Sequence, residues 1–203
     1  MTPDERRVAL EQIANEVRAC ERCRLHETRT RAVPGEGDPD TEVVFVGEGP
    51  GFNEDREGRP FVGRAGGLLV RMLQSIGWQR DDVFITNVVK CRPPDNRDPQ
   101  PDEIDACAPW LDRQLELIEP NVIVTLGNFA TKLLLDTKQG ITKLRGQEFP
   151  FSRAGIDATL LPALHPSAVL RGGGKTLAVA RADFVRVKRA LARARPVPTQ
   201  PAP

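Results

Sequence analysis

The chain has 203 residues, of which 39% are hydrophobic and 28% are charged, and its formal net charge at pH 7 is +1. This length supports one substantial hydrophobic core, and the near balance of charge excludes a histone-like polycation. No apolar run is long enough to span a membrane, and the N-terminus lacks the apolar segment of a signal peptide, so the sequence predicts a soluble cytoplasmic protein.

Strands and helices are predicted to alternate along the chain. Helical spacing of apolar residues predicts helices at the N-terminus, at 64–76, 101–118 and 129–135, and at the C-terminal end. Apolar, β-branched runs predict strands at 43–46, 82–89, 121–126 and 158–164. This order predicts one α/β domain over residues 1–195, a three-layer sandwich whose central, mainly four-stranded parallel sheet is flanked by helices. The proline-rich tail at 196–203 is expected to be disordered.

Polar side chains lie where three of the predicted strands end. Glu48 follows the first strand, Asn87 lies near the end of the second, and His165 follows the fourth. Because the carboxyl ends of parallel strands meet at one edge of a sheet, these groups are expected to border one ligand crevice. Together with Phe61, they supply the amide, imidazole, carboxylate and aromatic ring needed to hold a planar polar ring and attack beside it.

The four cysteines form a second group. Cys20 and Cys23 make a CxxC pair, and Cys91 and Cys107 lie far along the chain. Disulfides are not expected in a reducing compartment, which leaves a tetrahedral zinc site, an iron–sulfur cluster or four ordinary buried thiols. The wide spacing predicts that a metal would tie the N-terminal helix to the loop after the second strand, a structural role.

Four motifs carry a family resemblance. The sequences GEGPG at 47–51, GRPFVG at 58–63, TNVVKCRPP at 86–94 and HPS at 165–167 resemble those of the family 4 uracil-DNA glycosylases. The resemblance extends over nearly the whole chain and departs mildly around Gly49 and Phe52, where that family often has alanine or a polar residue. It implies a monomeric DNA-repair enzyme that removes uracil from single- or double-stranded DNA, leaves an abasic site, and carries a 4Fe-4S cluster on the four cysteines.

The resemblance also implies roles at the strand ends. Phe61 would stack on uracil beside Gly49, the Asn87 amide would pair with O4 and N3–H, and His165 would donate to O2 as charge develops there. Glu48 and Glu54 are both candidates to position or deprotonate the water; Glu48 is favoured because the strand end holds it, and Glu54 would instead guard the C5 side. Asp55 is expected to be a turn or cap residue.

DNA contacts are expected near the C-terminus. Residues 171–195 are strongly basic, and a loop at 168–174 is predicted to follow the histidine. This loop could press Leu170 and Arg171 into the gap left by a flipped base, or be simply flexible. Contacts to phosphate are predicted for a further group of residues, Thr142, Lys143, Arg145 and Lys175.

Two other functions fit parts of the pattern. One is a relative that traps uracil-containing DNA covalently or binds it tightly through a histidine in a long insert after the second strand; the loop at 91–103 has neither the insert nor a histidine. The other is a non-catalytic, metal-stapled DNA-binding module. Activity on hypoxanthine or xanthine is also left open.

Overall fold

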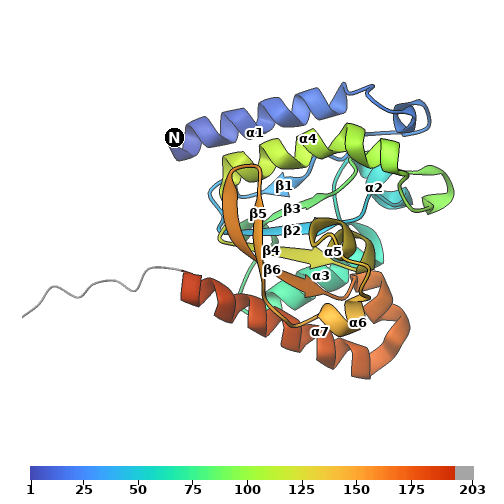
Figure 1. The fold of residues 1–203 in the computed structure, drawn as a ribbon. Coiled ribbons are helices and arrows are strands. Elements are labelled where there is room, and N and C mark those ends of the chain that lie inside the picture. The colour runs from blue at the N-terminus through green and yellow to red at the C-terminus, as the bar shows by residue number, and fades with distance from the viewer. Residues whose placement is uncertain (195–203) are drawn as a thin grey trace, which may run out of the picture.

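The computed structural model describes residues 1–194, and its core is one six-stranded sheet (Figure 1). The strand order is β1-β3-β2-β4-β6-β5. The strands are β1 (Glu36–Gly37), β2 (Val43–Gly47), β3 (Phe84–Asn87), β4 (Val122–Leu126), β5 (Phe149–Arg153) and β6 (Ile156–Ala163). The predicted disorder of 196–203 concerns residues outside the described part of the chain.

The four central strands are parallel, as predicted from their apolar runs. Strand β2 is buried along its whole length and alternates between two cores, with Val44 and Val46 facing one and Val43 and Phe45 facing the other. The antiparallel edge strands β1 and β5 were not predicted. Strand β1 has only two residues, and β5 contains Pro150 and exposed positions, so neither has the continuous apolar run of a central strand.

Helices cover both faces of the sheet (Figure 1). Helices α1 (Pro3–Arg18) and α4 (Pro101–Ile118) pack on one face, and α3 (Gly63–Ser75) and α7 (Pro166–Ala194) pack on the other. The shorter helices are α2 (Phe52–Glu57), α5 (Asn128–Leu134) and α6 (Ile141–Leu144). This is the predicted three-layer arrangement. Within residues 1–194, no helix combines the length and apolarity needed to cross a membrane.

The prediction of a loop at 168–174 is wrong. Helix α7 starts directly after His165 and is interrupted only at Gly173, whose φ of 70° lies in the left-handed region. Pro166 has the backbone angle that suits a helix start, and Val169, 2% exposed, anchors the first turns against the core. The glycine run therefore kinks a helix instead of forming a loop, and the insertion predicted for 168–174 would have to come from a helical segment.

Candidate active site

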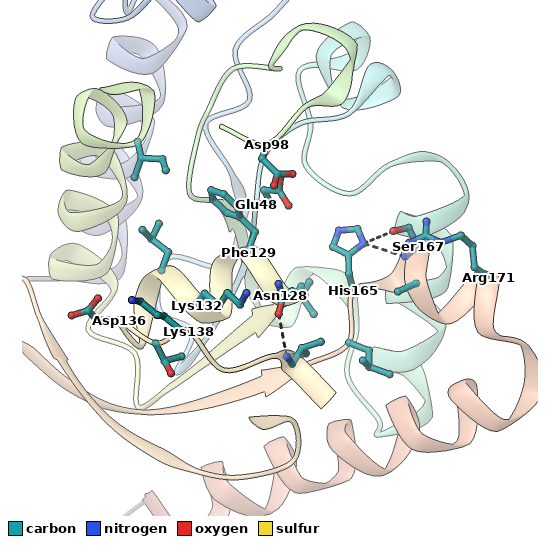
Figure 2. Close-up of a pocket in the computed structure, with 18 residues that line it drawn as sticks. Glu48, Asp98, Asn128, Phe129, Lys132, Asp136, Lys138, His165, Ser167 and Arg171 are labelled. Carbon is teal, nitrogen blue, oxygen red and sulfur yellow. Dashed lines mark hydrogen bonds between the residues drawn. The ribbon is translucent and has the colours of Figure 1, made fainter. Parts of the chain in front are cut away.

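A cavity of about 460 Å³ lies at the carboxyl edge of the sheet. Its lining includes Gly49, Phe61, Asn87 and His165, which come from four separate segments. A larger groove of about 760 Å³ adjoins it and shares four residues with it, Glu48, His165, Ser167 and Arg171 (Figure 2). The fold thus brings together the strand-end residues singled out in the sequence.

Asn87 presents an unpaired oxygen beside this cavity. It is the last residue of β3, its side chain is 2% exposed, and its Oδ1 has no hydrogen-bond partner in the described structure. A buried amide oxygen without a partner is costly unless a ligand supplies the hydrogen bond. Its strand neighbour Gly47 makes room for it, since a Cβ there would stand 2.4 Å from Oδ1.

Phe61 is held in a constrained backbone conformation. Its φ is 48°, which is rare for an aromatic residue, and its side chain is 7% exposed. Arg80 fixes this segment by donating to the carbonyl oxygens of Pro60 and Phe61, while its Nε donates to Glu36 Oε1 at 2.7 Å. The Phe61 ring lies 5.6 Å from the His165 imidazole between centroids. One wall of the cavity is therefore a fixed aromatic ring.

Gly66 allows this conformation of Phe61. A Cβ at Gly66 would stand 1.8 Å from the Phe61 carbonyl oxygen, so no other residue fits there without moving the segment. The roles of Arg80, Glu36 and Gly66 were not predicted, because each acts on the backbone of a residue distant in sequence.

His165 is set up as a neutral hydrogen-bond donor. Its Nδ1 accepts from the Ser167 backbone N–H at 3.1 Å and lies 2.7 Å from Ser167 Oγ (Figure 2). Burial, helped by the positive charge of Arg171, lowers the pKa of His165 to about 4. At neutral pH the ring is uncharged, and because Nδ1 accepts a hydrogen bond, the ring proton is on Nε2.

Glu48 faces a second carboxyl group. Figure 2 shows Glu48 and Asp98 side by side where the cavity and the adjoining groove meet. Burial raises the pKa of Glu48, the charge and hydrogen bonding of Asp98 raise it in the same direction, and together they bring it to about 7. A carboxylate with this pKa is suited to accept a proton near neutral pH. Asp98 was not predicted, because the proline-rich loop that carries it gave no signal beyond its irregular backbone.

Glu54 is engaged with the backbone at both oxygens. Oε1 accepts from the Val62 N–H at 2.9 Å and Oε2 from the Gly51 N–H at 3.1 Å. It thus ties the start of α2 to the segment that carries Phe61. The neighbouring Asp55, 4% exposed, accepts from the backbone N–H of Thr30 at 2.9 Å, so it joins α2 to a distant segment instead of acting as the expected turn or cap residue.

The four cysteines converge although they are far apart in sequence. Cys20, Cys23, Cys91 and Cys107 line one small cavity between the end of α1, the loop after β3 and helix α4. All four are free thiols. Arg29 Nη1 donates to Cys91 Sγ at 3.1 Å, and the Lys90 N–H donates to Cys107 Sγ at 3.2 Å. Burial raises the pKa of Cys91 and brings that of Cys107 to about 11, whereas these two donors act in the opposite direction and favour the thiolate, the form that binds metals.

Zinc and an iron–sulfur cluster place different demands on a set of four thiols. Within residues 1–194, no three His, Cys, Asp or Glu side chains converge closely enough to hold a single metal ion. Zinc needs its sulfurs about 2.3 Å from one centre, whereas a cluster of several irons takes one thiolate at each corner and so holds the sulfurs further apart. Four thiols around a common cavity are a ligand set that either kind of site uses.

The residues predicted to contact DNA differ in their surroundings. Leu170 is 37% exposed, and Arg171 borders both the cavity and the adjoining groove. Lys143 and Lys175 are exposed. Arg145 instead makes an ion pair with the buried Asp183, with Nη2 at 2.5 Å from Oδ1.

Comparison with known proteins identifies a superfamily for this chain. A family model described as the uracil DNA glycosylase superfamily matches residues 34–191. A type-4 uracil-DNA glycosylase of Sulfurisphaera tokodaii is 54% identical over 168 residues, 80% of this chain and 76% of its own. The type-4 uracil-DNA glycosylase of Thermotoga maritima is 49% identical, with 83% of this chain and 86% of its own covered. That of Saccharolobus solfataricus is 48% identical over 90% of this chain and 86% of its own.

Proposed function

The chain belongs to the uracil-DNA glycosylase superfamily, in its type-4 branch, and on this basis we propose that it removes uracil from DNA by hydrolysing the N-glycosidic bond. The product is an abasic site, so the reaction belongs to DNA repair. The observation that supports this most directly is the buried, unpaired Asn87 Oδ1 beside a cavity that Phe61 and His165 also line.

Uracil is recognised by its donor and acceptor pattern. Asn87 Oδ1 accepts from uracil N3–H while its amide N–H donates to O4, and Phe61 stacks on the ring beside Gly49. Cytosine has no proton on N3 and carries an amino group at C4, so both hydrogen bonds would be lost and the buried amide left unpaired. The base must leave the stack to enter the cavity, because the glycosidic bond is inaccessible inside a duplex.

The bond is cleaved by water. Glu48 accepts a proton from a water molecule as the water oxygen attacks C1′. The C1′–N1 bond breaks, and its electron pair goes to uracil. His165 Nε2–H donates to uracil O2, where negative charge develops, and it does so from a neutral ring held by Ser167. Glu54 is the alternative base, but both its oxygens already accept backbone N–H bonds, which favours Glu48.

DNA is held outside the cavity by basic residues. Arg171 at the cavity rim and Leu170 beside it are proposed to fill the gap left by the flipped base. Lys143 and Lys175 are proposed to contact phosphate, which positions DNA without reading its sequence. Arg145 joins them only if it can leave Asp183, its partner in the ion pair.

A 4Fe-4S cluster is proposed on Cys20, Cys23, Cys91 and Cys107. Such a cluster would supply a rigid cross-link between the end of α1, the loop after β3 and α4. Arg29 and the Lys90 N–H would donate to its cysteine sulfurs. We further propose one domain over residues 1–195, acting as a monomer in the cytoplasm on uracil-containing DNA.

The test is uracil release from a labelled single-stranded oligonucleotide, with alkali to break the strand at abasic sites. Strands carrying thymine or cytosine in place of uracil are the substrate controls. We expect breaks at uracil alone, with the rate reduced about 100-fold in Asn87→Ala and unchanged in Asn15→Ala, an exposed asparagine on α1. A shift of the oligonucleotide on a gel without any breaks would overturn the enzymatic function in favour of a DNA-binding module.

A further inference from the structure

One aromatic side chain lies exposed beside the mouth of the cavity. Phe52, the first residue of α2, is 58% exposed, and it is the one aromatic among the strongly exposed large hydrophobic residues of 1–194. An isolated exposed aliphatic residue needs no explanation, but an aromatic ring of this exposure leaves a large apolar area in water.

Two guanidinium groups flank this ring. Arg92 lies 5.4 Å and Arg56 6.0 Å from its centroid. Arg92 comes from the proline-rich loop and is fixed there by a 2.8 Å hydrogen bond from its Nε to Asn96 Oδ1. Two segments distant in sequence therefore meet to build one aromatic surface with two positive charges over the ring.

This surface is continuous with the cavity. Gly51, which precedes Phe52, and Pro93 and Asn96, which follow Arg92, all line the cavity proposed to receive uracil. A strand whose uracil enters that cavity must carry its neighbouring nucleotides past this rim. Nucleic-acid strands are bound in this way elsewhere, by aromatic rings that stack on bases and arginines that neutralise the backbone.

We propose that Phe52, Arg56 and Arg92 form a stacking platform for the unpaired base next to the flipped uracil. The proposal rests on the proposed function, since it assigns a further part of the same substrate to the same site. When the strand binds, the guanidinium groups that lie over the ring turn to the phosphates on either side, and the ring face they uncover stacks on any base. The platform is used when the neighbouring base is unpaired and is idle when that base stays in a duplex.

The experiment compares Phe52→Ala and Phe52→Trp with Val185→Ala, which truncates a 40% exposed side chain on α7. The readouts are the KM and the maximal single-turnover rate of uracil release. On a single-stranded oligonucleotide we expect Phe52→Ala to raise KM about tenfold with an unchanged maximal rate, and the tryptophan variant to stay within twofold of the native protein. On a duplex the alanine variant should change KM less than twofold.

A second substrate tests the contact itself. When the base 5′ or 3′ of uracil is replaced by an abasic analogue, the native protein should lose affinity at one of the two positions. Phe52→Ala should lose nothing further there. An unchanged KM for Phe52→Ala on single strands, or an equal loss on duplex, would overturn the platform. Absence of uracil release by the native protein would instead overturn the proposed function.

Discussion

The substitution Asp98→Asn isolates the effect of one carboxylate on the pKa of another. Glu48 has a pKa of about 7, raised first by burial and then by Asp98. Asparagine keeps the size of the side chain and removes its charge, so the part of the shift due to Asp98 is lost while that due to burial remains. A like-charged neighbour commonly contributes on the order of one pKa unit, which would bring Glu48 to roughly 6.

This shift has a calculable effect on rate. If Glu48 must be ionised to accept a proton from water, about one tenth of the native protein is active at pH 6, against about one half of the variant. Uracil release by Asp98→Asn should therefore be about fivefold faster at pH 6 and unchanged at pH 9. His165 does not contribute to the loss of activity between pH 9 and pH 6, because the pKa of its ring, about 4, lies well below that range.

The assay is the single-turnover rate of uracil release from a single-stranded oligonucleotide between pH 5 and pH 9. Asp95→Asn is the matched control, since Asp95 lies in the same loop but lines neither the cavity nor the adjoining groove, which Asp98 does line. Because the folded-state pKa of Glu48 is raised, ionisation of Glu48 lowers the free energy of unfolding as pH rises toward 7. Asp98→Asn makes this loss smaller, so the variant should be more stable than the native protein at pH 8 and equally stable at pH 5. The reasoning would be refuted if the rate of uracil release fell at the same acidic pH in Asp98→Asn as in the native protein. It would also be refuted if Asp95→Asn moved that pH by the same amount as Asp98→Asn.

Three further changes test other parts of the molecule. Gly47→Ala places a methyl group 2.4 Å from Asn87 Oδ1 and 2.7 Å from the Phe61 ring, so uracil release should fall about 100-fold in single-turnover assays; a native rate would show that the cavity is not shaped by this contact. Lys90→Met removes a buried ammonium that donates to Thr86 Oγ1, Asn87 O and Gln114 Oε1. Urea denaturation should show that the free energy of unfolding falls by about 3 kcal/mol. It should not change in the control Lys138→Met, because Lys138 is exposed. Cys107→Ser should abolish the brown colour and most of the bound iron measured in the purified protein, whereas a colourless native protein containing zinc would contradict the cluster.

Local sequence signals were sufficient for the central sheet. Strands β2 and β4 are short, apolar except for Thr125 in β4, and bounded by turn residues, so their position and parallel arrangement could be predicted. Strand β5 could not, because it pairs with β6 through its backbone while its side chains alternate between buried and exposed. The loop predicted around the glycines at 172–174 was wrong for a related reason. Glycines permit a loop, but they do not require one when packing anchors the flanking helical turns.

The site was predictable where function requires a particular side chain. Glu48, Asn87 and His165 could be placed at one edge because parallel strands end there. The residues that hold them are different. Asp98 acts on Glu48 and Arg80 on the Phe61 backbone, each in another segment of the chain. The residues next to Asp98 and Arg80 in the sequence form no pattern that predicts these contacts. Such positions become visible only when the chain is folded.

The most direct test of the central claim is the product of the reaction. A single-stranded oligonucleotide with one uracil is incubated with the native protein and with Glu48→Gln, and free uracil and abasic sites are quantified together. We predict one free uracil for each abasic site from the native protein and a rate about 100-fold lower from the variant, with Glu21→Gln on the surface unchanged. Tight binding without free uracil, or equal release by Glu48→Gln, would contradict a hydrolysis in which Glu48 accepts the proton from water.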